Sequence, residues 1–87
     1  MTFQGAVVRE QGVTFAVVVV QHSALSTTSG AGALIASFQR FFPGIPVALM
    51  GQDSRGVPKY VGRHDIVRFL ASVSISRIPW REYSLSA

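Results

Sequence analysis

The amino-acid sequence predicts a small α+β domain in the form of a single two-layer sandwich. Three observations support this class: one long run rich in valine, two stretches with the apolar spacing of a helix, and short strand-like segments between turns that contain Gly or Pro. Taken along the chain, these segments give the order ββαββα. The simplest packing is a four-stranded mixed sheet with two helices on one face. All 87 residues, 1–87, are expected to form a single domain.

The longest apolar run, Val13–Val20, predicts the central strand of this sheet. A membrane-crossing helix needs about 20 apolar residues, so the run is too short to span a bilayer. Valine is stiff in a helix and packs well on a pleated sheet. Because side chains alternate between the two faces of a strand, both faces of this strand are apolar. We therefore expect it to be covered on both sides, or by helices on one side and a partner subunit on the other.

Residues 3–9 predict the first strand, which pairs with the central strand in a hairpin. A two-residue loop at Gln11-Gly12 suits a tight turn, because glycine takes a positive φ without steric cost. The first strand is more polar than the second, so we expect it at an edge of the sheet, where Arg9 and Glu10 would help to block edge-to-edge pairing. The expected cross-strand pairs are Val8 with Phe15 and Ala6 with Val17.

An amphipathic helix is predicted over Ala31–Phe42. Its apolar residues recur at spacings of three, four and seven, and Pro43-Gly44 ends it. The preceding loop, residues 22–32, is rich in small and hydroxyl-bearing residues, and Thr28 or Ser29 is expected to cap the helix. Because this helix connects the second strand to the third, those two strands are expected to be parallel.

The second half of the chain predicts a hairpin followed by a second helix. Strands are expected at residues 45–50 and 57–61, each with a proline near its start, where a missing N–H is tolerated. The helix is expected at residues 65–73, with one buried apolar stripe. The tail, residues 76–83, is expected to form a turn or a short 3₁₀ segment.

One part of this pattern resembles a known family. Ile45-Pro46-Val47 enters a strand, a hairpin follows, and Val61-Gly62-Arg63 leads into the second helix. Over residues 45–73 this arrangement looks like the C-terminal half of the thioredoxin fold, in which a cis proline precedes the third strand and faces a pair of active-site cysteines. The chain contains no cysteine. The resemblance therefore implies a thioredoxin-like fold that lacks the redox residues.

Composition predicts a partner surface. Charged residues make up 14% of the chain, where about 25% is usual, and hydrophobic residues make up 48%. A small protein has much surface relative to its volume, so an apolar patch is expected to remain uncovered. With both faces of the central strand apolar, the sequence predicts a homo-oligomer, most simply a dimer, formed through an apolar face of the sheet.

The reactive residues of the chain are few. Without cysteine there is no disulfide, thiol nucleophile or thiolate-bound zinc, which fits a cytoplasmic location. Two histidines and four carboxylates do not predict a metal site, and we expect no cofactor. His22 lies near Ser23 and Ser26, but catalysis would also need a group that orients the histidine, and none is evident. No catalytic residue and no membrane contact are predicted.

Two sets of residues are candidates for binding. In the 22–32 loop, Ser29, Gly30 and Gly32 have the small side chains and free N–H groups that hold an anion at a helix start; the alternative is a crossover loop with an ordinary cap. The net charge of +4 is concentrated after residue 52 and suggests an acidic partner. There the candidates form a basic patch that suits phosphate groups or a nucleic acid, or else a solvated rim. The patch consists of Arg55, Lys59, Arg63, His64 and Arg68.

These observations favour a small non-enzymatic domain that associates with itself and acts as a binding or interaction module. The first alternative is an anion or nucleic-acid binder that uses the basic region Arg55–Arg68. The second alternative is the thioredoxin-like fold without redox cysteines.

Overall fold

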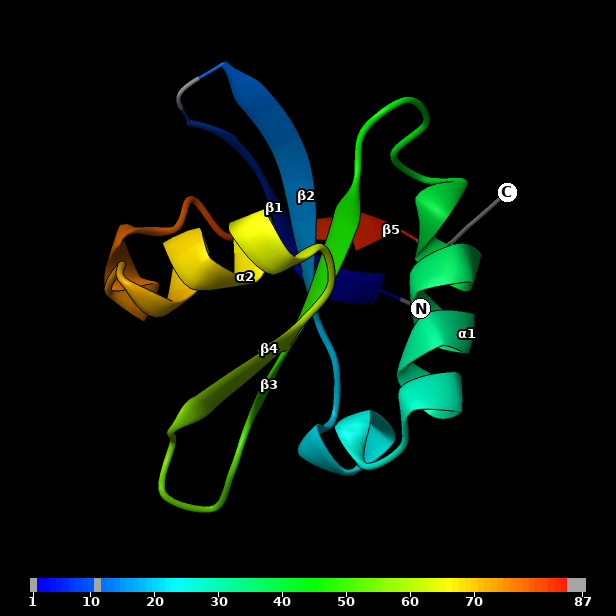
Figure 1. The fold of residues 1–87 in the computed structure, drawn as a ribbon, viewed down its shortest axis with the longest axis vertical. Helices are drawn as coiled ribbons and strands as arrows, with labels where there is room; N and C mark the ends of the chain where they lie inside the picture. Colours follow the sequence, from blue (N-terminus) through cyan, green and yellow to red (C-terminus); the bar gives the residue numbers. More distant parts are fainter. Residues whose placement is uncertain (1, 11, 85–87) are drawn as a thin grey trace.

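The computed structural model describes residues 2–10 and 12–84, which form an α+β domain with two helices and one five-stranded mixed sheet. The strands lie in the order β4-β3-β2-β1-β5 (Figure 1). Two short 3₁₀ helices complete the fold, His22–Leu25 (η1) and Ile75–Arg77 (η2). The other elements are β1 (Thr2–Glu10), β2 (Val13–Val19), α1 (Thr28–Gln39), β3 (Val47–Gln52), β4 (Pro58–Val61), α2 (His64–Ala71) and β5 (Arg81–Ser84).

The first hairpin has the predicted register. β1 and β2 are antiparallel, with Val8 opposite Phe15 and Ala6 opposite Val17. In the predicted loop, Gly12 has a φ of 80°, a conformation that glycine adopts without strain, while Gln11 lies outside the described residues.

β2 is the central strand, as its sequence predicts. It is third of the five strands, and its second neighbour is β3, which runs parallel to it after the α1 crossover. The side chains of Ala16, Val17 and Val18 are fully buried. A run that is apolar at successive positions needs cover on both faces, and it receives that cover within the chain.

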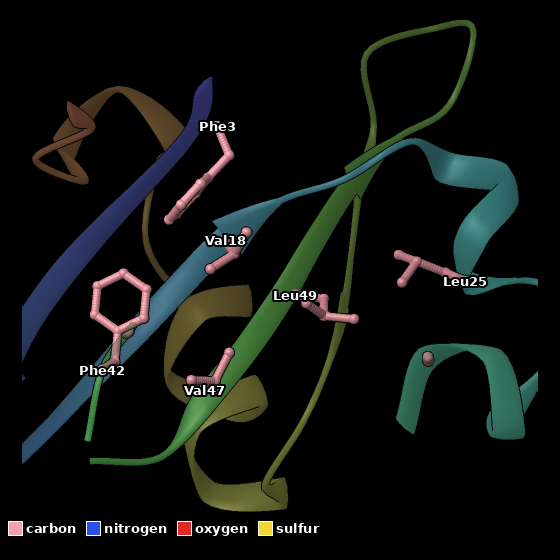
Figure 2. Packing of buried hydrophobic residues seen from close by; sticks show 8 residues of the cluster. Phe3, Val18, Leu25, Phe42, Val47 and Leu49 are labelled. Carbon is pink, nitrogen blue, oxygen red and sulfur yellow. The ribbon is translucent and has the colours of Figure 1, made fainter. Parts of the chain in front are cut away.

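The two helices lie on opposite faces of the sheet, so the prediction of a two-layer sandwich with both helices on one face is wrong. Alternate residues of the central strands point into two separate cores. The α1 core holds Val18 and Leu49, with Phe3 of β1 and Leu25 of η1 (Figure 2). The α2 core holds the neighbouring strand residues together with Ile66, Leu70 and Ile78. Figure 1 shows α1 and α2 on either side of the twisted sheet.

The sheet has five strands rather than the predicted four. The tail, residues 76–83, was expected to be a turn or a 3₁₀ segment, and within it only Ser76 and Arg77 belong to a 3₁₀ helix, η2. Arg81–Ser84 forms β5, which pairs antiparallel with Thr2–Gly5 of β1. The ring of Tyr83 stacks on Phe3 at a centroid distance of 5.2 Å. The first half of β1 is therefore an inner strand, and the prediction that β1 lies at an edge is wrong for these residues.

The first helix starts and ends three residues earlier than the predicted 31–42, and the predicted caps, Thr28 and Ser29, lie inside it. Its cap is Thr27, whose Oγ1 accepts a hydrogen bond from the N–H of Gly30 at 3.0 Å, and the helix ends at Gln39. The Gln39 side-chain amide then donates to the backbone carbonyls of Phe42 and Ile45. These bonds hold the chain reversal that leads into β3. The second helix, β3 and β4 lie within two residues of their predicted positions.

Candidate functional site

The three anion-binding candidates lie inside the first turns of α1 rather than in a loop. Because Thr27 is the cap, Ser29, Gly30 and Gly32 are all helical residues. The N–H of Gly30 is used by the Thr27 hydroxyl, and the N–H of Ala31 donates to the Thr27 carbonyl at 3.1 Å. The N–H of Gly30, one of the groups expected to hold an anion, is therefore already hydrogen-bonded within the chain.

The five basic candidates are divided between the two faces of the sheet. Along β4, Tyr60 points into the α2 core and Val61 into the α1 core, so Lys59 shares the α1 side with Val61. Arg63, His64 and Arg68 belong to the start and the body of α2, on the other side. Arg55 lies in the exposed turn between β3 and β4. The predicted basic patch is thus not one continuous surface.

One of these cations is already paired. Arg63 and Asp65 form a two-point ion pair on the surface, with Nε to Oδ1 at 2.7 Å and Nη2 to Oδ2 at 2.8 Å. The hydrogen bond from Arg63 lowers the pKa of Asp65 from its ordinary 3.8 to about 2, and it raises the pKa of Arg63. Asp65 also lies in the first turn of α2, where a negative charge is favourable. The pair therefore stabilises the start of α2, and it leaves Arg63 less available to bind a ligand.

This ion pair predicts a specific loss of stability in acid. The folded chain holds Asp65 at a lower pKa than the unfolded chain, so the pair stabilises the fold above about pH 4, and this contribution is lost as the pH falls toward about 2. We expect Asp65→Asn to remove that part of the pH dependence of the unfolding free energy. Urea unfolding at a series of acidic pH values measures it. Arg63→Gln should have the same effect, and an unchanged acid slope in both variants would contradict the assignment.

Lys59 meets the segment that precedes α1. Its ammonium group lies 3.4 Å from the carbonyl oxygen of Leu25, which accepts a hydrogen bond from it. Beside them is a depression of about 260 Å³, lined by apolar side chains and by the hydroxyl-bearing residues Ser26, Thr27 and Thr28. The fold thus brings together one basic candidate and the start of the 22–32 candidate loop, which are 34 residues apart along the chain.

Two further depressions flank the helices. One, of about 130 Å³, lies between the first hairpin and α2, over Phe15, Ile66 and Phe69, with Glu10 and Asp65 among its lining residues. The other, of about 380 Å³, lies along α1 and the residues after it, where the Arg40 guanidinium is 5.4 Å from the centre of the Phe41 ring. Both are open to the solvent.

Tyr60 has a buried hydroxyl group with no hydrogen-bond partner among the described residues. Burial raises the pKa of this phenol above its ordinary value of 10.0. The neutral phenol is thus the form that the fold favours, and Tyr60 contributes its ring to the α2 core.

Over Ala6–Glu10 the outer edge of β1 is open, which confirms for these residues the prediction that the first strand lies at an edge; the exposed valine in it was not predicted. β5 pairs only with Thr2–Gly5, so no strand in the described part of the chain lies beside Ala6–Glu10 on that side. In this stretch Val7 is 43% exposed, and among residues 2–10 and 12–84 the one other large hydrophobic residue that is exposed is Val57. The only signal in the sequence is the valine at a position that alternates with buried residues.

Neither a metal-binding cluster nor a membrane-crossing helix is found in the described part of the chain. Within residues 2–10 and 12–84, no three His, Cys, Asp or Glu side chains gather closely enough to hold a metal ion. No helix in the same residues combines the length and the apolar character needed to cross a bilayer.

No protein-family model, curated protein or solved structure matches this chain. The likeness of residues 45–73 to the thioredoxin fold therefore stays a resemblance in sequence pattern.

Proposed function

We propose that this chain is a small non-enzymatic interaction domain that associates with further copies of itself. The observation that supports the proposal is the uncharged exposed face of α1. Residues 11–52 contain a single charged residue, Arg40, and they build β2, η1, α1 and β3. The exposed side chains of α1 are small and uncharged, and they include Ser29, Ala33, Ala36 and Ser37.

A charge-poor surface favours association because of the cost of desolvation. Removing an ion from water costs several kcal/mol unless it finds a well-placed partner, and charged residues are depleted at the centres of protein interfaces for this reason. Over the exposed face of α1, a partner would need to desolvate almost no charge; the cations on this side of the sheet, Arg9 and Lys59, lie on β1 and β4. The α2 side differs, because Arg63, Asp65 and Arg68 are exposed there.

The surface through which the sequence predicts self-association is already covered within the chain. That surface was an uncovered apolar face of the sheet, and each face is covered by a helix of the same chain. The proposal now rests on the low charge content and its uneven distribution. The cytoplasmic location expected from the absence of cysteine stays a prediction.

Sedimentation equilibrium tests this proposal directly. At micromolar concentrations and above, we expect a mass that rises with concentration toward at least twice the 9.4 kDa of one chain. The experiment should be repeated at high salt, which weakens contacts between exposed charges and leaves an uncharged contact in place. A mass of one chain at every concentration would contradict the proposal.

Anion or nucleic-acid binding by the region Arg55–Arg68 is the second candidate. The observation that favours it is the position of Lys59, whose ammonium group adjoins hydroxyl-bearing residues in the depression next to η1. Inorganic phosphate and a short oligonucleotide are suitable probes, followed by shifts of backbone amide resonances. We expect Lys59→Gln to weaken binding and Arg68→Gln, on the opposite face, to leave it unchanged. Equal effects of both variants would point to unspecific attraction by net charge.

A further inference from the structure

The open edge of β1 is a surface at which the sheet can be extended. β1 is nine residues long, and its neighbour β5 is four residues long. Past Gly5, β1 therefore continues along the hairpin with β2 on one side and no strand of the described chain on the other. In Figure 1 the β1–β2 hairpin projects from the body of the molecule at the top of the view. An unpaired edge of this kind offers backbone N–H and C=O groups to a further strand.

This edge carries few of the features that prevent strand addition. Natural edges are blocked by charged side chains, lysine above all, by proline, by a bulge or by very short length. Ala6–Glu10 contains no proline and no lysine, and its pairing with β2 is regular from Gly5 to Glu10; its two charged residues, Arg9 and Glu10, are the features that oppose strand addition. The opposite edge of the sheet is different, because β4 has only four residues and begins with Pro58.

We propose that the strand added at this edge is β1 of a second copy of the chain. The two strands would run antiparallel about a two-fold axis through Val8, and the two sheets would join into one. This inference rests on the proposed self-association and assigns its contact to the edge of β1 rather than to the exposed face of α1.

The register follows from the length of the open stretch. β5 occupies the edge as far as Gly5 and the turn begins after Glu10, so a symmetric antiparallel pair that uses the whole stretch has its centre at Val8. Each Val8 then faces the partner's Val8, and each Val7 faces the partner's Arg9. Directly opposed residues lie on the same face of a joined sheet, and these pairs satisfy that condition.

The side chains suit this register. No two like charges are directly opposed, because Arg9 meets a valine and Glu10 meets the partner's Ala6. The aliphatic stem of Arg9 can cover the exposed Val7 of the other copy while its guanidinium stays in water. Val7 and Arg9 lie on the α1 side of the sheet, as Phe3 does. The charge-poor layers of the two copies would thus lie on the same side of the joined sheet.

The experiment compares two exposed valines. Val7→Lys places a lysine opposite the partner's Arg9 at two symmetric positions, and we expect self-association at least about tenfold weaker in sedimentation equilibrium. Val57→Lys adds the same charge at the other exposed valine, far from this edge, and should leave association unchanged. Adding Arg9→Glu to Val7→Lys opposes unlike charges across the pair and should restore association. Circular dichroism confirms that each variant is folded.

The outcomes separate this inference from the proposed function. If the wild-type chain is a monomer, both fail. If the wild-type chain associates and Val7→Lys associates equally well, the edge is not the contact, while the proposed function stands. The same conclusion follows if Ala36→Lys, on the outer side of α1, abolishes association and Val7→Lys does not. Restored association in the Val7→Lys, Arg9→Glu double variant supports the antiparallel register.

Discussion

Replacing Phe3 with alanine is expected to lower the free energy of unfolding by about 3–5 kcal/mol. The ring of Phe3 is buried and joins three parts of the fold to β1. Its centroid lies 4.9 Å from that of Phe38 in α1, 6.2 Å from that of Phe42 before β3, and 5.2 Å from that of Tyr83 in β5. Alanine would leave a cavity where these elements meet, and the aromatic contacts would be lost with it.

The size of this loss matters because the domain is small. A chain of 87 residues is expected to have a total stability of about 4–13 kcal/mol, so the substitution removes a large share of it. Urea unfolding measures the change. Phe3→Leu, which keeps most of the buried volume, should cost clearly less, and Val57→Ala at an exposed position should stay within about 0.5 kcal/mol of wild type. A loss below about 1 kcal/mol for Phe3→Ala would mean that β5 and α1 are held independently of this ring.

Phe3 also shows why β5 was not predicted. Local patterns identify strands that carry their own apolar alternation, as Val13–Val19 does, and the register of the first hairpin followed from the length of its turn. Arg81–Ser84 has one apolar side chain, Tyr83, in four residues. This segment forms a strand because Tyr83 stacks on Phe3 of the neighbouring strand, a contact between residues near the two ends of the chain. A window of sequence contains no information about such a contact.

For a similar reason, the sequence did not predict that the two helices lie on opposite faces of the sheet. The apolar residues on both faces of β2 indicated correctly that each face needs cover. They did not indicate whether the second cover is a helix of the same chain or another subunit, because both supply the same kind of surface. The candidate site shows the same limit: Lys59 and Arg63 are neighbours in the sequence, yet strand alternation and the turn at Gly62 send them to opposite sides.

A second large effect is expected for Leu70→Ala in α2, with a loss of about 2–5 kcal/mol. Leu70 is fully buried, and it packs with Ile66 and the strand residues Phe15 and Val17. α2 has only eight residues, which is too short to be helical without tertiary contacts. Arg68→Ala is the matched control, because it lies on the exposed side of the same helix and should cost no more than about 0.5 kcal/mol.

Leu70→Ala also distinguishes the two ways in which this face of the sheet can be covered. Trp80, the only tryptophan, packs against the same core and donates its indole N–H to the carbonyl of Ile75 at 3.0 Å, so its fluorescence reports on the α2 layer. If the chain covers this face by itself, the loss of stability relative to wild type at the same protein concentration should be the same at every concentration, because self-association at another surface stabilises both proteins alike, and the red shift of Trp80 on unfolding should not differ either. If a second subunit covered it, raising the concentration would recover part of the loss by mass action. We expect no such recovery, because α2 and Ile78 already occupy the face that a partner would need.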